Sequence, residues 1–402
     1  MPSMTRPGPW LGLLAVLAAC GPAAEPPAPD PVVELSGPAR SGKGFLAATA
    51  GGGAVLTWFE RTPDDQAALR IATRDGGTWS EARTIAQHDR FFVNWADFPS
   101  VVETTDGRWV VHWLEKTAAR PYAYHVMLAV STDRGASWGE PIRAHADTTS
   151  SEHGFAALSA RPDGGVDIVW LDGQAMVAEH EGPMQLRFGS LLADGSRGPE
   201  MLLDSMTCEC CQSRLVRTTS GLVASYRNRT EAEIRDIGVV RLADGQWQAP
   251  TLVADDGWEH RACPVNGPGL AAQGDRVGLA WYTQADSLPR VMFAWSEDGG
   301  ASFGTPVRLD AGDPVGRAEM VIEDDGAALV TWLEGTGQTS AEWRMVRVAP
   351  DGTVGPARVI HRTAKNRDTG FARMVRAGND LLVTVTAVGD TGGVRVLRVE
   401  GN

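Results

Sequence analysis

Cysteines are the residues whose types and spacing point most directly to chemistry. The 402-residue chain contains five of them. Cys208, Cys210 and Cys211 lie within four consecutive positions, and Cys263 follows about fifty residues later. Thiols in an oxidising compartment favour disulfides, so we expect one or two bridges, with Cys263 joined to one of the other three.

A soft-metal site is the alternative use of the same four thiols. Thiolates are the ligands that copper and zinc favour in proteins, and His260 or Met206 could complete such a site. The C-x-C-C spacing differs from the C-x-x-C of zinc knuckles, and the chain has no C-x-x-C-H motif for covalent haem. The sequence therefore leaves disulfides and a copper or zinc site as the two interpretations, with no other cofactor indicated.

The fifth cysteine, Cys20, belongs to a targeting segment. An apolar stretch of about ten residues, Trp10–Ala19, is too short to span a bilayer and suits a signal peptide. It ends in Leu-Ala-Ala-Cys, which resembles the bacterial lipobox, in which the cysteine is lipidated. We therefore expect a lipoprotein signal peptide at 1–19 and a lipidated Cys20.

Residues 20–30 then form a Pro/Ala-rich tether that cannot build a core. The chain is expected to be exported and lipid-anchored to the cell envelope. Because Gly21 stands where a retention Asp could follow the cysteine, the resemblance favours the outer membrane, on its periplasmic or its surface side, if the host is Gram-negative. Net charge of −13 excludes a general nucleic-acid binder, which needs a basic surface.

A sevenfold repeat dominates the rest of the chain. Short apolar strands ending in an aromatic and a polar residue, such as VLTWFE, VVHWLE and LVTWLE, recur at intervals of 51 to 57 residues. The anchor positions of the seven copies are Trp58, Trp113, Trp170, Tyr226, Trp281, Trp332 and Val385. Each copy lies among four short β segments separated by Asp-Gly turns, which predicts the blade of a propeller.

The fold class expected is therefore all-β, a β-propeller of four-stranded antiparallel blades in one domain, 31–402. The last unit supplies three strands, and Pro31–Ser36 is a spare strand before the first full unit. If this N-terminal strand closes the last blade, the ring has seven blades. Six blades is the alternative.

Two turns carry a family mark. Ser131–Trp138 matches the pattern Ser-x-Asp-x-Gly-x-x-Trp, and Ser296–Phe303 matches it with Phe for Trp. These turns resemble the Asp boxes, or BNR repeats, of the sialidase (neuraminidase) superfamily. The resemblance implies the propeller fold. It says little about activity, because such turns are structural.

Unusual residues gather at the starts of the innermost strands and the ends of the second strands, which share one face of a propeller. Loops at one end of a rigid scaffold commonly build binding sites. The expected ligand-binding residues are Asn94, Trp95, Asp97, His153, Arg227, His260, Arg261, Asn266, Arg317, Glu319, Arg367 and Asp368. Further polar residues at the same end are Lys43, Glu60, Glu115, Glu152, Asp172, Asn228, Arg229, Gln284 and Glu334.

Resemblance to sialidases implies three arginines that hold a substrate carboxylate, a Tyr–Glu nucleophile and an Asp acid. Asp97 could supply the acid, and Arg261, Arg317 and Arg367 could supply arginines, so these are the candidate catalytic residues. None of the four tyrosines stands at the expected late-blade position. The arginine that opens the first blade in sialidases is replaced by the sequence around Lys43.

The function expected is that of an envelope-anchored, sialidase-like propeller lipoprotein. It would bind a small molecule, a carbohydrate or a protein partner on the face that carries the cysteine motifs, and the membrane through Cys20. One alternative is an exo-sialidase or other glycoside hydrolase acting on acidic sugars. The other is a protein that handles copper or zinc with Cys208, Cys210, Cys211 and Cys263.

Overall fold

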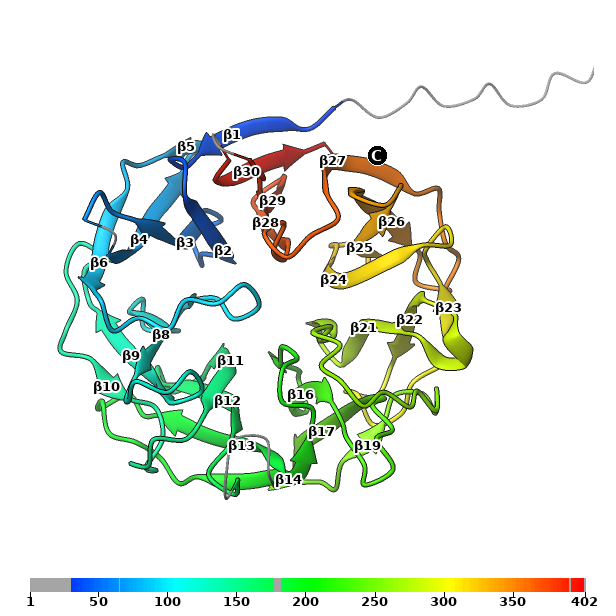
Figure 1. Cartoon of the computed structure of the whole chain (residues 1–402), viewed down its shortest axis with the longest axis horizontal. Coiled ribbons are helices and arrows are strands. Elements are labelled where there is room, and N and C mark those ends of the chain that lie inside the picture. The colour runs from blue at the N-terminus through cyan, green and yellow to red at the C-terminus, as the bar shows by residue number, and fades with distance from the viewer. Residues whose placement is uncertain (1–29, 65, 177–181, 390–391, 401–402) are drawn as a thin grey trace, which may run out of the picture.

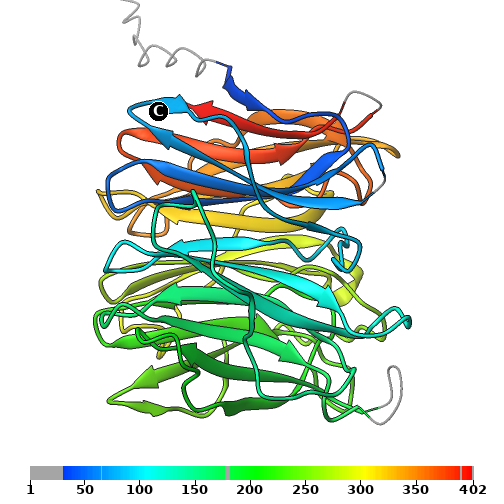
Figure 2. The same ribbon diagram turned by 90° about the vertical axis from the view of Figure 1, so that its left-hand side faces the viewer.

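A computed structural model describes residues 30–400 apart from 65, 177–181 and 390–391. The described chain forms a ring of seven antiparallel sheets (Figure 1), which confirms the predicted seven-bladed propeller. The expected signal peptide, the tether and Cys20 lie outside the described residues, except for Asp30. Figure 2 shows the ring edge-on, with the strands running between its two faces.

We number the blades I to VII along the chain. The strands of blades I to III are β2 (Ser41–Ala48), β3 (Ala54–Arg61), β4 (Ala67–Asp75), β5 (Thr78–Trp79), β6 (Arg83–His88), β7 (Ser100–Glu103), β8 (Trp109–Lys116), β9 (Tyr124–Ser131), β10 (Ile142–Arg143), β11 (His153–Ala160), β12 (Val166–Asp172), β13 (Met184–Leu191) and β14 (Met201–Thr207). Blade I comprises β2 to β6, blade II β7 to β10, and blade III β11 to β14.

The strands of blades IV to VII are β15 (Arg214–Arg217), β16 (Gly221–Arg227), β17 (Ile237–Ala243), β18 (Gln246–Trp247), β19 (Thr251–Leu252), β20 (Gly269–Gln273), β21 (Arg276–Thr283), β22 (Arg290–Ser296), β23 (Val307–Arg308), β24 (Pro314–Ile322), β25 (Ala328–Gly335), β26 (Ser340–Val348), β27 (Arg358–Ala364), β28 (Arg373–Ala377), β29 (Asp380–Thr386) and β30 (Val394–Val399). Blade IV comprises β15 to β19, blade V β20 to β23 and blade VI β24 to β27. Blade VII comprises β28 to β30 with β1 (Val32–Ser36).

Ring closure is as expected, because β1 pairs with β30 as the outer strand of blade VII. The β1 residue Glu34 forms ion pairs with Arg74 of blade I, at 2.7 Å, and with Arg398 of β30, at 3.1 Å. The two ends of the described chain therefore lie side by side in one sheet (Figure 1).

The repeated phrase is the second strand of every blade, and its anchor side chain is buried in all seven copies. Four of these phrases place an acid two residues after a tryptophan, and in three of them the acid accepts a hydrogen bond from that indole. The Trp170 indole N–H donates to Asp172 at 2.7 Å, and Trp332 donates to Glu334 at 2.6 Å. A buried indole needs such an acceptor, so these acids serve the core.

The turns at 131–138 and 296–303 share one hydrogen-bond network. In the first, the Ser131 hydroxyl donates to Asp133 and accepts from the Gly135 N–H, while Asp133 also accepts from the Ser137 N–H at 2.8 Å. In the second, Ser296, Asp298, Gly300 and Ser302 repeat these bonds. The carboxylate thus closes a tight turn between the third and fourth strands.

Helical structure in the described part of the chain is limited to one 3₁₀ turn, Ala285–Ser287. Among the described residues, no helix has the length and apolar content needed to cross a membrane.

Candidate functional site

We call the face that carries the starts of the inner strands the upper face. The loop between β6 and β7 extends over this face toward the centre of the ring, drawn in cyan in Figure 1. Beside it lies a cleft of about 990 Å³, whose lining includes Lys43, Glu60, Asn94, Trp95 and Asp368. The structure therefore brings five of the upper-face residues singled out by sequence into one cleft.

Trp95 lies at the inner end of this loop and contacts two of the candidate arginines. The guanidinium of Arg317 lies 5.0 Å from the centre of the Trp95 ring, and that of Arg367 lies 5.5 Å away. Phe371 stacks on the same indole at 5.8 Å. Cation–π contacts fix the ring, so Trp95 is a rigid part of the cleft wall.

Three inner strands begin with the same irregularity. Lys43, Phe155 and Arg317 each follow a glycine, have φ of 60°, 51° and 59°, and lie where the register to the second strand shifts. Positive φ is uncommon for such residues and marks a β-bulge that redirects the side chain. Burial lowers the pKa of Lys43 and lowers that of Arg317 to about 10.

Several candidates turn out to be structural links. Arg227 is fully buried and donates to the backbone carbonyls of Asn266, Arg235 and Tyr282. Asn266 accepts from the Arg317 N–H at 2.7 Å, and Arg317 donates to backbone carbonyls of the 366–370 loop. These groups tie adjacent blades together and are committed to protein partners.

Glu319 lies among buried cations in the middle of the ring. It pairs with Arg214 at 3.0 Å and with Arg373. Burial lowers the pKa of Arg214 to about 9 and also lowers that of Arg373. One carboxylate thus holds two guanidinium groups that have lost their water, and removing it would leave both unpaired.

Asp97, the candidate acid, is a buried residue of the loop between β6 and β7. Its carboxylate accepts from the Phe155 N–H at 2.6 Å, and burial raises its pKa to about 7. Asn94 accepts from the N–H groups of Ala96 and Asp97, so it shapes the loop. Asp97 has the pKa of a general acid but is only 5% exposed.

The arginines and tyrosines do not assemble the sialidase arrangement that the resemblance implies. Arg261 is exposed and pairs with Glu259 at 3.3 Å, whereas Arg317 is buried and bonded to backbone. Tyr124 does donate to Glu152, at 2.5 Å, but it is 1% exposed and burial raises its pKa well above the ordinary value. A Tyr–Glu pair is present, inside blades II and III.

The cysteine motifs meet on the upper face, between blades III, IV and V. The Cys208 Sγ atom lies 3.4 Å from Cys211 Sγ and 3.7 Å from Cys210 Sγ, and the three sulfurs lie within 4.8 Å of one another. We call Cys208, Cys210 and Cys211 the cysteine cluster. The Cys263 thiol interacts with that of Cys210 and helps to raise its pKa.

All four cysteines are free thiols in the structure. The disulfides expected from the sequence therefore stay a prediction, and Cys263 has the expected position beside Cys210 of the cluster. A disulfide needs sulfurs about 2.05 Å apart. Separations of 3.4 and 3.7 Å are those of thiols that share hydrogen bonds or one ligand.

Cations and N–H donors surround the cluster. Arg235 donates to Cys208 Sγ at 3.1 Å, and the Asn266 N–H donates to Cys211 Sγ at 3.3 Å. Burial opposes ionisation of Cys208, but hydrogen bonds from the Cys210 and Cys211 thiols and the charge of Arg235 hold its pKa well below its ordinary value. Burial raises the pKa values of Cys210 and Cys211.

The suggested helpers of the cluster differ in position. His260 stacks on Trp258 at 5.0 Å, and burial together with the charge of Arg235 lowers its pKa. Met206 is fixed through its backbone N–H, which donates to Asp204.

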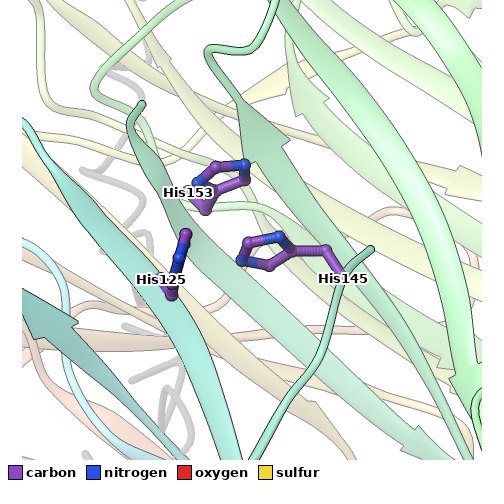
Figure 3. Close-up of side chains that lie close together, drawn as sticks. All are labelled: His125, His145 and His153. Atoms are coloured by element: carbon purple, nitrogen blue, oxygen red, sulfur yellow. The ribbon is translucent and has the colours of Figure 1, made fainter. Parts of the chain in front are cut away.

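A second group of potential ligands includes two residues that sequence reasoning missed. His125, His145 and His153 lie together between blades II and III, with one ring nitrogen of each within 4.8 Å of the others (Figure 3). Only His153 begins an inner strand. His125 lies near the start of a third strand, and His145 follows a fourth strand. The start of a third strand and the end of a fourth strand also lie on the upper face. The sequence positions of His125 and His145 could therefore have identified them.

Comparisons with known proteins bear on the fold. No family model matches the sequence. No curated protein matches it either. The structure resembles the BP39L lectin of Burkholderia pseudomallei with a TM-score of 0.63 and 12% identity, covering 90% of this chain and 98% of that one.

It also resembles the GH93 α-L-arabinofuranosidase of Fusarium graminearum, solved with arabinobiose, with a TM-score of 0.51 and 11% identity over 93% and 97% of the two chains. The NanB sialidase of Streptococcus pneumoniae has a TM-score of 0.49 and 8% identity over 86% and 83%. Identities this low show the fold alone, which this chain shares with the lectin and the arabinofuranosidase.

Proposed function

We propose that this chain is an envelope-anchored propeller that binds a thiophilic metal ion, Cu(I) or Zn(II), at the cysteine cluster. The observation that carries the proposal is the separation of the sulfurs, 3.4 and 3.7 Å. Two thiolates bound to one tetrahedral metal at about 2.3 Å lie about 3.8 Å apart. Thiolate ligands select soft ions, and we assign Cys263, whose thiol interacts with that of Cys210, as the fourth ligand, which must move toward the cluster on binding.

The surroundings of the cluster favour thiolates that bind a metal ion. Cys208 is held as a thiolate, which is the form that binds metals. Arg235 donates to its sulfur and pairs in turn with Glu209 at 3.1 Å and Glu233 at 2.8 Å. Such outer partners hold a ligand in position and offset the negative charge of several thiolates around one ion.

Anaerobic titration of the reduced full-length protein with Cu(I) and with Zn(II), each against a competing chelator, tests the metal site. We expect the cysteine cluster to take up one ion per chain, and this ion to bind at least about tenfold more weakly in Cys208→Ser and Cys211→Ser. His361→Gln, which alters a histidine on β27, serves as the matched control and should bind as the wild type does. Unchanged binding in Cys208→Ser/Cys211→Ser would contradict the proposal.

A peptide map under non-reducing conditions separates the two uses of the thiols. If the protein isolated from its host contains a bridge between Cys263 and the cluster, the disulfide expectation is correct and the resting protein does not hold a metal there. If four unbridged thiols are recovered, and bound metal slows their alkylation, the metal site is supported.

The anchor is part of the proposal and rests on the N-terminal motif. Cys20→Ala should leave the protein unlipidated and move it from the membrane fraction to a soluble fraction. Labelled fatty acid should enter the wild-type protein only. Failure of the wild type to incorporate the label would show that the lipobox assignment is wrong, without bearing on the metal site.

The cleft beside Trp95 supports a second candidate function, the binding of an acidic sugar or other small ligand. Its wall combines an indole with Lys43 and Asp368, and aromatic rings with a few polar groups are typical of ligand sites. Two structural neighbours are by name a lectin and an arabinofuranosidase. Glycan-array binding that disappears in Trp95→Ala would support this function, and turnover of fluorogenic sialosides would support the glycosidase alternative.

A further inference from the structure

The histidine cluster, His125, His145 and His153, is assembled from three separate segments. His125 lies on β9, His145 lies two residues beyond β10, and His153 is the first residue of β11. Figure 3 shows the three rings facing a common space. His145 and His153 are fully buried, while His125 is half-buried at the edge of the cluster. An ion could therefore reach the group past His125.

One buried ring nitrogen of each histidine in this cluster has no hydrogen-bond partner within the described part of the chain. His145 Nδ1 lies 3.1 Å from the Asp147 carbonyl, and His153 Nδ1 lies 3.2 Å from the carbonyls of Tyr124 and Ser151. A carbonyl only accepts, so these contacts place a proton on the Nδ1 atom of both rings. Both Nε2 atoms are buried and unsatisfied, as is His125 Nδ1.

Carboxylates point at the same space. Asp147 Oδ2 lies 3.1 Å from His153 Nε2, and Asp172 Oδ2 lies 3.7 Å from it. The Thr149 and Ser151 hydroxyls donate to the same Asp147 oxygen, at 2.6 and 3.0 Å, and hold the carboxylate in place. Because a carboxylate oxygen only accepts, either a proton on Nε2 or a metal cation must lie between these groups.

We propose that His125, His145, His153 and Asp147 bind one divalent metal ion of borderline softness, with Zn(II) as the best fit. Three imidazoles and a carboxylate are a donor set that zinc accepts with tetrahedral geometry. Asp172, fixed by the Trp170 indole N–H at 2.7 Å, supports His153 from outside the ligand set. This site is separate from the cysteine cluster, which lies between other blades.

Ring orientation defines what must move on binding. The His125 ring stands at 68° to His145 and 61° to His153, as ligands of one ion do. The rings of His145 and His153 are stacked 3.7 Å apart at 8°, so their in-plane lone pairs run parallel. One ring must turn, and His145 is the freer of the two, because His153 Nδ1 faces two carbonyls and His145 Nδ1 only one.

Cobalt(II) distinguishes this site from the cysteine cluster. Co(II) bound by thiolates gives intense near-ultraviolet charge-transfer bands, whereas nitrogen and oxygen ligands give only weak visible bands. In full-length Cys208→Ser/Cys211→Ser protein we expect one Co(II) or Zn(II) bound without the thiolate bands. His125→Gln should weaken that binding at least about tenfold, and His361→Gln should not. Circular dichroism and metal-free melting temperature check that each variant folds.

Nitrogen-15 NMR of the imidazoles supplies the readout that is independent of affinity. Zinc should shift the Nε2 resonances of His145 and His153 and leave Nδ1 protonated. The proposal is overturned if the thiol-deficient protein binds no zinc at micromolar concentration, or if His153 is found protonated at both nitrogens with no metal. In either case the cluster is a buried hydrogen-bonding group between two blades.

Discussion

The cysteine and histidine clusters are both built on the upper face between neighbouring blades, but their surroundings carry opposite charge. Arg235 donates to the sulfur of Cys208, so that cluster is held by a cation. Asp147 and Asp172 face His153, so the other is held by anions. A guanidinium stabilises thiolates, and carboxylates stabilise a cation among neutral imidazoles. The same scaffold can therefore present one soft and one borderline metal site.

Loss of ring closure should have the largest effect on stability and metal binding, because both clusters depend on the relative positions of adjacent blades. Deleting residues 21–37 removes β1 and its Glu34 ion pairs. We expect the melting temperature to fall by at least about 5 °C and metal binding at both clusters to weaken. Deleting 21–29 alone removes only tether and serves as the control. Equal melting temperatures would refute closure by β1 as a source of stability.

Arg235→Gln should separate the two clusters. Because it removes the cation next to Cys208, Cu(I) affinity at the cysteine cluster should drop about 10- to 100-fold. Zinc affinity at the histidine cluster should not change. Arg229→Gln is the matched control, since Arg229 pairs with Glu233 at 2.6 Å and no contact joins it to a sulfur among the described residues. Competition titrations of both metals measure the difference, and equal losses in the two variants would argue against a specific role for Arg235.

Asp97 sharpens the comparison, because it is a buried acid whose desolvation outweighs the charge of Arg373. Its pKa is about 7 in the folded state against an ordinary value of 3.8. Between these values the folded protein holds a proton that the unfolded chain has lost, so stability should fall as pH rises from about 4 to about 7. The slope contributed is at most about 1.4 kcal/mol per pH unit. Urea unfolding at several pH values should show a flatter profile for Asp97→Asn, and identical profiles would contradict the shifted pKa.

Asp172→Asn should have the smallest effect and the opposite specificity to Arg235→Gln. The amide keeps an acceptor for the Trp170 indole but removes the charge near His153. Zinc affinity at the histidine cluster should fall up to about tenfold, with Cu(I) binding unchanged. Glu334→Gln makes the same change at the matching position of blade VI, where Trp332 is the donor. If both variants weaken zinc binding alike, the charge of Asp172 is not the cause.

Much of the fold could be predicted from sequence, because the repeat has a structural cause: each copy is the buried second strand of one blade. Each anchor such as Trp170 or Trp332 must be buried on a second strand, and its spacing counts the blades. The closing strand could be predicted because the last unit has only three β segments and a blade needs four. The proximity of Cys263 to Cys210 followed from the shared end of adjacent blades.

Side-chain direction could not be predicted. Arg227 and Asn266 lie at the expected end of their blades, yet they turn inward to satisfy buried backbone groups. His125 and His145 were missed because site residues were expected only at the starts of inner strands and the ends of second strands. Outer strands also reach the upper face, but a single histidine there has no distinctive sequence pattern. The state of the thiols was open for another reason. Disulfide and metal ligation require the same residues at the same spacing.

X-ray absorption at the copper edge of the full-length protein loaded with one equivalent of Cu(I) tests the central claim most directly. The account predicts a first shell of sulfur alone, at about 2.3 Å, that is lost in Cys208→Ser/Cys211→Ser. A first shell of nitrogen or oxygen, or a spectrum unchanged in that variant, would contradict a metal site at the cysteine cluster.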